Sequence, residues 1–308
     1  MEKLFIELTN NKIGYFFYIE KIFEKQSKFQ NILVANTNYF GKCLFLDNVP
    51  QFSEKDEFIY HESIVQPAVH LHTNPKKVLI LGGGDCLSAR EFFKHDNIEK
   101  VVLIDIDPEV VEISKKYFSH LAQGAYEDPR LEIHSQDAYN YVKTTEEKFD
   151  IIVMDLTDPG QPIGKSFYCN EFFIMCKRIM NEGAIFVTHG SSMSVSFPTA
   201  TKVFSSFKKS FKYSEMFTSS FINSYNSPIG FLLGHDSEII TDIDKIESRY
   251  LKVKNKLKYY SPKMHRVMFH RPKWLSDEIK SAQPLPENYT EVQKSKFLES
   301  DFLSFFDE

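Results

Sequence analysis

The chain has 308 residues, of which 42% are hydrophobic and 26% are charged, a composition ordinary for a soluble globular protein. Its formal net charge of −5 gives no basic surface for nucleic acid or an anionic membrane, so we expect neither as a partner. The four cysteines lack disulfide or zinc spacing, no signal-peptide pattern opens the sequence, and no apolar run approaches about 18 residues. These features predict a cytoplasmic protein with reduced thiols, no metal site and no membrane span.

The first seventy residues are expected to form β-hairpins, because short apolar runs in residues 29–53 are broken by Asn, Gly and Pro. From Lys76 onwards, apolar strands alternate with helical segments. The expected strands are residues 78–82, 101–107, 131–137, 149–156 and 184–190, and the expected helices are a stretch around 89–93 and residues 108–118, 138–144 and 170–180. Further on we expect a helix near 198–211, an antiparallel pair at 214–221 and 229–235, and an amphipathic helix at 240–258.

Strands that are near-continuous apolar runs and alternate with helices indicate a parallel sheet covered on both faces. The sequence therefore predicts an α/β, doubly wound domain at residues 71–275, preceded by a small β domain at residues 1–70. A tail follows at residues 276–308, and its acidic, aromatic part after Pro286 is expected to be a flexible arm or an interface. Pro108 suits the first turn of a helix, and Gly183 suits a helix C-terminal cap.

The stretch "LILGGGDCLSARE" joins the first strand of this series to a helix through a glycine-rich turn. Gly82 and Gly84 fit the dinucleotide motif G-x-G-x-x-G, but Leu87 stands at its third position. Asp85 would face a bound pyrophosphate, and two such like charges repel by several kcal/mol in a partly dry site. The turn therefore favours a cation over a phosphate. Asp85 can alternatively, or additionally, cap the helix that follows.

Acidic residues also follow the next three strands, and ligands of such sheets bind at the carboxyl ends of the strands. Asp105 stands where an acid holds a ribose diol, or else it caps the next helix; Asp137 can reach an adenine amino group or cap a helix. Asp155 and Asp158, in "DLTDP", can serve an amine substrate, a turn or a divalent metal. A metal would need more oxygen ligands and would compete with a cationic substrate, so an adenosine pocket without phosphate is predicted.

These residues carry a resemblance to a known family. The chain resembles the polyamine aminopropyltransferases, the spermidine and spermine synthase family, whose "GGGDG…RE", "[ED]-[IL]-D" and "D-x-x-D-P" motifs correspond to residues 82–91, 105–107 and 155–159. Upstream "SKFQNILV" and "DEFIYHE", and downstream "SYNSPIGF" and "KYYSPKMHRVMFHRP", extend the resemblance over residues 14–272. The loop "GQPIGKSFYCNEFF", with "LTDP" before it, is nearer to the thermospermine synthase branch.

The resemblance implies a Rossmann-like sheet of the class I methyltransferase type and the transfer of an aminopropyl group from decarboxylated S-adenosylmethionine to a small cationic amine such as putrescine, with release of methylthioadenosine. It implies no cofactor, since the donor is a co-substrate, and a homodimer or homotetramer. The implied donor-binding residues are Gln30, His61, Gly82, Gly84, Asp85, Asp105, Asp137 and Ala138. The implied acceptor-binding residues are Tyr60, Asp155, Asp158 and Tyr225, and Asp155 would also be the catalytic acid/base.

Two positions depart from the family pattern. Cys86 replaces the usual glycine, so the turn must avoid a left-handed backbone there or bear a modest strain, and His189 stands where glutamine is usual. Several alternatives stay open: a thermospermine or spermine synthase that uses spermidine, a class I methyltransferase, a nicotinamide dehydrogenase and a catalytically silent polyamine sensor. A methyltransferase would need a group that binds the donor's carboxylate near the glycine turn, which Asp85 cannot do. The sequence leaves open the acceptor, the subunit number and the role of the tail.

Overall fold

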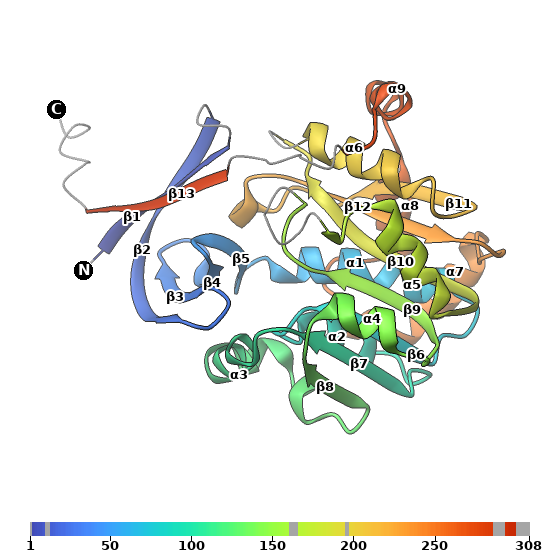
Figure 1. Cartoon of the computed structure of the whole chain (residues 1–308), viewed down its shortest axis with the longest axis horizontal. Helices are drawn as coiled ribbons and strands as arrows, with labels where there is room; N and C mark the ends of the chain where they lie inside the picture. The colour runs from blue at the N-terminus through green and yellow to red at the C-terminus, as the bar shows by residue number, and fades with distance from the viewer. Residues whose placement is uncertain (1, 10–12, 160–165, 195–196, 286–292, 300–308) are drawn as a thin grey trace.

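The computed structural model describes residues 2–9, 13–159, 166–194, 197–285 and 293–299, and these residues form two β-sheets with helices around the larger one (Figure 1). The smaller sheet has six strands in the order β13-β1-β2-β3-β4-β5. The larger sheet has seven strands in the order β11-β12-β10-β9-β6-β7-β8. No helix in these described ranges is long and apolar enough to cross a membrane.

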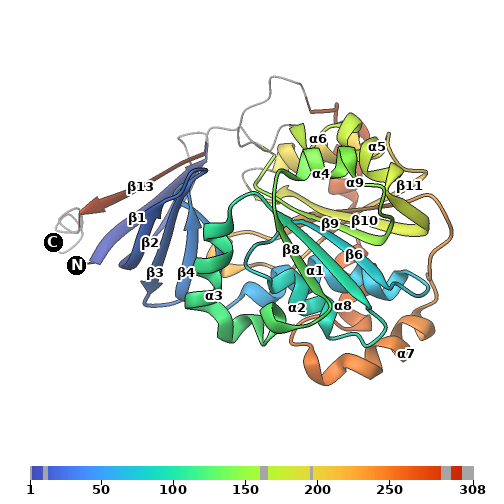
Figure 2. The same cartoon turned by 60° about the horizontal axis from the view of Figure 1, so that its bottom comes forward.

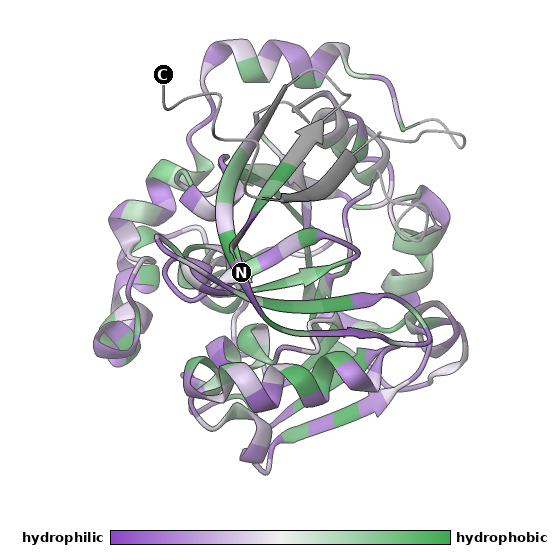
Figure 3. Ribbon diagram, turned by 90° about the vertical axis from the view of Figure 1, so that its left-hand side faces the viewer, coloured by the Kyte–Doolittle hydropathy of each residue, from purple (hydrophilic) through white to green (hydrophobic). Residues whose placement is uncertain are grey.

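The N-terminal sheet is antiparallel, as the hairpin pattern predicted. Its first five strands are β1 Glu2–Thr9, β2 Ile13–Gln26, β3 Asn31–Thr37, β4 Gly41–Leu46 and β5 Val49–Ser53. Figure 3 looks at this sheet from its own side of the molecule and shows hydrophobic and hydrophilic residues interspersed along its strands. Phe5, Leu33 and Phe45 are buried in a small cluster that is separate from the core of the larger sheet.

The expectation of β structure over the first seventy residues is wrong beyond Ser53, because α1 forms at Glu57–Leu71. This helix is buried on nearly every side, including at the polar residues Glu62, Gln66 and His70. A helix buried all round lacks the one-sided apolar periodicity by which helices are recognised in a sequence. The β interpretation therefore failed where burial removed the helical pattern.

The predicted tail contributes a strand to the N-terminal sheet. β13, Gln293–Glu299, pairs antiparallel with β1, with Lys3 opposite Glu299. A sixth strand thus covers the hydrogen-bonding edge that β1 would otherwise present to solvent. Just before it along the chain, α9 at Lys273–Ser281 spans the predicted start of the tail and packs on α6. Residues 286–292 lie outside the described residues.

The larger sheet confirms the doubly wound, Rossmann-like prediction. Its strands are β6 Lys77–Gly82, β7 Lys100–Asp105, β8 Leu131–Ser135, β9 Phe149–Asp155, β10 Met180–Ser192, β11 Tyr213–Thr218 and β12 Ile229–His235. The five neighbouring strands β10, β9, β6, β7 and β8 are parallel to one another. β12 lies between β10 and β11 and runs antiparallel to both. The expected antiparallel pair near the end of the domain is therefore present.

Helices cover both faces of this sheet (Figure 2). One face is covered by α1 together with α2 Leu87–Phe93, α3 Pro108–Ala122, α7 Ile243–Val253 and α8 Pro262–Phe269. The other face is covered by α9 together with α4 Ala138–Thr144, α5 Asn170–Arg178 and α6 Phe197–Phe207. Short 3-10 turns lie at Ala125–Glu127, Asn223–Tyr225 and Lys254–Lys256. Along β6, Val78 and Ile80 face the α1 side and Leu79 and Leu81 face the other, so both faces are apolar and buried.

Two turn predictions have different outcomes. Pro108 is the first residue of α3, as expected of a residue with a fixed φ and no N–H to donate. The prediction that Gly183 caps a helix is wrong, because α5 ends at Arg178 and Gly183 lies within β10. Its positive φ of 78° falls where the pairing between β10 and β9 is interrupted. The glycine therefore serves an irregularity in a strand, not a helix end.

Candidate active site

One cavity of about 750 Å³ lies at the carboxyl ends of the parallel strands, with residues of the N-terminal sheet on its other side. The structure brings all twelve residues predicted to bind substrates to its wall. They are Gln30, Tyr60, His61, Gly82, Gly84, Asp85, Asp105, Asp137, Ala138, Asp155, Asp158 and Tyr225. Among the described residues, no lysine or arginine lines this cavity. Its wall is thus acidic, and the roles of the individual residues stay predictions.

The glycine turn after β6 brings the main chain against two of these acids. At Gly82, where φ is +85°, a β-carbon would lie 2.1 Å from the carbonyl oxygen of Asp155. At Gly84, a β-carbon would lie 2.8 Å from Asp105 Oδ2. Glycine is therefore required at Gly82 for both conformation and space, whereas at Gly84 it leaves room for the Asp105 carboxylate.

Asp85 and Asp105 flank this turn. Asp85 Oδ1 accepts a hydrogen bond from the N–H of Leu87 (2.8 Å), the first residue of α2, although the N-cap position that the sequence analysis considered for Asp85 is occupied by Cys86. Asp105 Oδ2 accepts from the N–H of Gly84 (3.0 Å), and its Oδ1 accepts from the N–H of Asp107 (2.9 Å). Burial raises the pKa of Asp85 to about 6 and that of Asp105 to about 6, even though these hydrogen bonds favour the charged forms.

The alternative that Asp105 caps α3 is wrong, because Asp107 occupies that position and accepts from the N–H of Glu109 (3.1 Å). Asp107 is fully buried, and its Oδ2 also accepts from Ser27 Oγ (2.6 Å) and Gln30 Nε2 (3.1 Å). It therefore ties the chain between β2 and β3 to the Asp105 end of the cavity and orients Gln30. The sequence analysis missed this role, although Asp107 is the second aspartate of the "[ED]-[IL]-D" motif.

Asp137 does cap α4: its Oδ1 accepts from the N–H of Tyr139 at 2.7 Å. The side chain is exposed and also lines the cavity beside Ala138, so capping and ligand contact are compatible. A carboxylate has about four lone-pair directions, of which the cap uses one.

Asp155, at the end of β9, is held by two hydroxyl groups. Tyr60 Oη donates to its Oδ1 (2.8 Å), and Ser88 Oγ donates to its Oδ2 (2.8 Å). Burial and the nearby negative charge of Asp155 raise the pKa of Tyr60 well above its usual value, so Tyr60 keeps its proton and remains a donor. The contribution of Ser88 was not foreseen, because a serine in the first turn of a helix carries no distinctive pattern.

Asp158 and Tyr225 lie at the predicted acceptor end of the cavity. Tyr225 Oη donates to the carbonyl oxygen of Gln51, which joins the domain of the larger sheet to the β4–β5 hairpin. His189, one of the two positions that depart from the family pattern, lies close to Asp158. Its Nδ1 is 3.7 Å from Asp158 Oδ1, and its Nε2 donates to the carbonyl oxygen of Leu156 (2.7 Å). The histidine that stands where the family usually has glutamine thus lies beside Asp158, which is predicted to bind the acceptor.

The other departure, Cys86, adopts the left-handed conformation, with φ 59° and ψ 14°. Of the two outcomes open from the sequence, the turn therefore bears the strain. Cys86 is fully buried, and burial raises the pKa of its thiol above the usual range, so the thiol is not a reactive group at neutral pH.

Carboxylates at the ends of four successive parallel strands, with no lysine or arginine in the described wall, give this Rossmann-like fold an acidic cavity at the edge where such sheets bind ligands. Comparison with known proteins identifies the family. Residues 57–242 match the model of the spermine/spermidine synthase domain, and residues 4–54 match that of the spermidine synthase tetramerisation domain. The chain belongs to the polyamine aminopropyltransferase family of enzymes, as the motifs indicated.

Individual relatives cover most of the chain. A polyamine aminopropyltransferase of Pyrobaculum aerophilum is 39% identical over 80% of this chain and 87% of its own length, and one of Thermococcus onnurineus is 35% identical over 90% and 96%. A spermidine synthase solved with the transition-state analogue AdoDATO has a TM-score of 0.84 and 29% identity, covering 90% of this chain and 95% of that one. The spermidine synthase of Thermotoga maritima has a TM-score of 0.81 and 28% identity, with coverage of 90% and 94%.

Proposed function

We propose that the protein transfers an aminopropyl group from decarboxylated S-adenosylmethionine to a polyamine such as putrescine and releases methylthioadenosine. The observation that supports this most strongly is the charge of the cavity: Asp85, Asp105, Asp155 and Asp158 line it, and no lysine or arginine does among the described residues. Both substrates are cations, whereas a pyrophosphate or a donor carboxylate would meet like charge on this wall.

The donor fits the half of the cavity near the glycine turn. Asp105 would bind the ribose hydroxyls, Asp137 and Ala138 would lie at the adenine, and Gln30 would complete this end. Asp85 would pair with the ammonium at the end of the aminopropyl chain. This pairing would orient the other end of that chain, the aminopropyl carbon bonded to sulfur, toward the acceptor. Orientation of this kind can lower a barrier by several kcal/mol. Asp85 keeps Oδ2 for this role, because its hydrogen bond to the main chain of α2 uses Oδ1.

The acceptor would lie between Asp155 and Asp158, with Tyr60 and Tyr225 against its methylene groups and charges. The acceptor's amine nitrogen first loses a proton to Asp155, directly or through a water. It then attacks the aminopropyl carbon bonded to sulfur. The carbon–sulfur bond breaks with its electrons on sulfur, so the sulfonium becomes the neutral thioether of methylthioadenosine. Because Tyr60 and Ser88 each donate to one oxygen of Asp155, the carboxylate is fixed in one orientation for this transfer.

The proposal needs no cofactor beyond the co-substrate, and we propose a cytoplasmic homo-oligomer. The match to a tetramerisation domain supports the assembly, and its subunit number, two or four, stays a prediction.

The decisive experiment presents the purified protein with decarboxylated S-adenosylmethionine and, separately, with putrescine, cadaverine, agmatine and spermidine. Mass spectrometry then identifies the products. Methylthioadenosine formed together with an amine heavier by one aminopropyl group supports the proposal, and the preferred amine defines the acceptor. Methyl transfer from S-adenosylmethionine would show a methyltransferase, and binding without turnover would show a silent sensor.

A further inference from the structure

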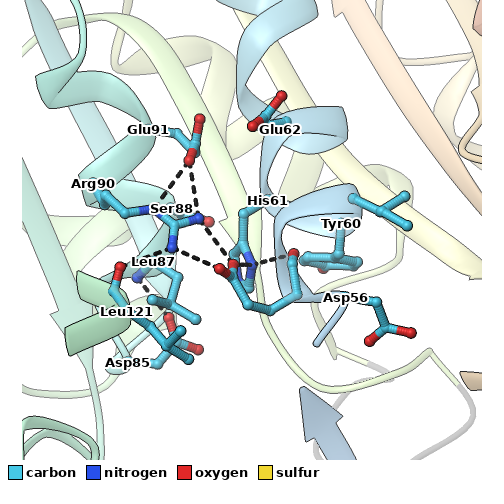
Figure 4. A network of polar contacts seen from close by, with 12 residues as sticks. Asp56, Tyr60, His61, Glu62, Asp85, Leu87, Ser88, Arg90, Glu91 and Leu121 are labelled. Atoms are coloured by element: carbon cyan, nitrogen blue, oxygen red, sulfur yellow. Dashed lines mark hydrogen bonds and ion pairs between the residues drawn. The ribbon is translucent and has the colours of Figure 1, made fainter. Parts of the chain in front are cut away.

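Behind the donor half of the cavity, α1 and α2 are joined by a buried charge network (Figure 4). Arg90 on α2 donates to both oxygens of Glu57 on α1, from Nη1 to Oε1 and from Nη2 to Oε2, each at 2.8 Å. Glu57 and Arg90 are 2% and 5% exposed. A bidentate pair of this kind fixes the orientation of both partners. The Glu57 carboxylate is therefore held rigidly at the first turn of α1.

The same carboxylate holds the imidazole of His61, one helical turn further along α1. His61 Nδ1 lies 2.9 Å from Glu57 Oε2 and 2.7 Å from the carbonyl oxygen of Glu57. Both are acceptors, so Nδ1 must carry the proton. Within the described part of the chain, both hydrogen bonds of the imidazole use Nδ1, and His61 lines the cavity. Nε2 is therefore the nitrogen left for a ligand.

The groups that face His61 are mostly acidic. Glu57 lies on the same helix, Asp85 on the glycine turn and Asp155 at the end of β9, while the Tyr60 ring on α1 is 5.2 Å from the imidazole and Arg90 acts through Glu57. Burial lowers the pKa of His61, but these three carboxylates outweigh it and raise that pKa. The charge of His61 in turn opposes the burial that raises the pKa of Asp85 to about 6. Both shifts favour a proton retained by the Asp85–His61 pair while the cavity is empty.

We propose that Glu57, held by Arg90, is a positioning residue that fixes the Nδ1–H form of His61 and leaves Nε2 for the cavity near Asp85, so that Nε2 gives up its proton and accepts from the donor's ammonium when the donor binds. The inference rests on the proposed function, because it assigns the ammonium of the donor to this pair. The charge balances: one cation enters and one proton leaves. A ligand that lacks the aminopropyl ammonium would not displace the proton. Glu57 would therefore help to distinguish the donor from the methylthioadenosine that the reaction releases.

The chain supplies a matched control in Glu62, which lies on the same helix and is also fully buried. Its carboxylate accepts from the N–H groups of Lys258, Tyr259 and Tyr260 at 2.8, 2.9 and 2.7 Å. The Glu62 carboxylate therefore anchors the segment at residues 258–260, whereas the hydrogen bonds of the His61 imidazole within the described residues go to Glu57. Glu62→Gln removes a buried negative charge from α1, as Glu57→Gln does, but leaves the imidazole with its carboxylate.

The test is isothermal titration calorimetry of the purified full chain near pH 6.5, in buffers with different heats of ionisation, which counts protons released per ligand bound. Wild type should release a substantial fraction of one proton with decarboxylated S-adenosylmethionine and none with methylthioadenosine. Glu57→Gln should release fewer protons, and its affinity for the donor near pH 8.5 should fall about tenfold, the loss of one charge-assisted hydrogen bond. Its affinity for methylthioadenosine should not change. Glu62→Gln should behave as wild type in all these measurements, although it unfolds more easily.

The outcomes are distinguishable. If wild type binds the donor without releasing a proton, or if Glu57→Gln releases as many protons as Glu62→Gln, the inference is overturned and the proposed function stands. The wild-type count tests the proton exchange; if Glu57→Gln does not fold, Arg90→Lys, which removes the bidentate hold on Glu57, takes its place in the comparison. If wild type does not bind the donor at all, the proposed function and the inference both fail.

Discussion

The strained turn at Cys86 gives a quantitative prediction. Cys86 has φ 59° and ψ 14° and precedes α2, where Arg90 N–H donates to its carbonyl oxygen at 2.9 Å. A residue with a β-carbon is destabilised there, whereas glycine is not. Replacing Cys86 with glycine removes the strain and the thiol together, and replacing it with alanine removes only the thiol. The difference in stability between the two variants therefore reports the backbone strain less the entropic cost of glycine.

The strain of a left-handed residue is about 1–2 kcal/mol, and glycine gives back about 0.5–1 kcal/mol through the greater freedom of the unfolded chain. Cys86→Gly should therefore be more stable than Cys86→Ala by about 1 kcal/mol. Burying the thiol stabilises the protein by about 1 kcal/mol, so Cys86→Ala should be less stable than wild type and Cys86→Gly close to it.

Cys176 supplies the control, because it is fully buried like Cys86 but lies inside the helix α5. There the order should reverse, with Cys176→Gly about 1 kcal/mol less stable than Cys176→Ala. Urea unfolding of the four variants, followed by circular dichroism, measures both differences. If glycine were the less stable choice at position 86 too, Cys86 would not have a left-handed backbone and the reasoning would be refuted.

Three further predictions concern activity and pH. Asp155→Asn should reduce kcat about a hundredfold or more with unchanged donor affinity, measured by methylthioadenosine release; turnover at the wild-type rate would remove Asp155 from catalysis. Gly84→Ala should displace the carboxylate of Asp105, because its Oδ2 would lie 2.8 Å from the new β-carbon. The affinities for the donor and for methylthioadenosine, measured by calorimetry, should both fall about tenfold. Unchanged affinities would argue against ribose binding by Asp105. Burial and the neighbouring His70 lower the pKa of His95 to about 3, so the unfolded chain takes up a proton there first and stability falls with pH below about 6.5. Between pH 7 and 5, wild type should lose about 2 kcal/mol more than His95→Gln in urea unfolding, and equal losses would contradict the assignment.

The acids of the cavity could be predicted from the sequence because parallel strands end at one edge of a sheet, so the residue after each strand has a known place. Asp85, Asp105, Asp137 and Asp155 all lie there. What each acid does locally could not be predicted in the same way. Whether an aspartate caps a helix depends on main-chain geometry within two residues, and Asp107, not Asp105, proved to cap α3.

The features that were missed depend on contacts between distant parts of the chain. Ser88 reaches Asp155 because β6, which leads into α2, pairs with β9 so that Gly82 lies opposite Asp155, and no local pattern marks that serine. α1 lacked a one-sided apolar periodicity because it is buried on nearly every side. β13 pairs with β1, which lies at the opposite end of the described chain. Patterns among residues close together in the sequence do not indicate such a long-range pairing.

The pairing of β1 with β13 has a consequence for how the protein is made. During translation β1 emerges before any other described element and β13 after all of them, so the small sheet cannot acquire its last strand until the rest of the fold has been synthesised. Until then the nascent sheet presents an open backbone edge, a template for association with neighbouring chains. Completing that sheet is thus a late, post-synthetic event, and the interval before it is when wrong pairing with other nascent copies is easiest.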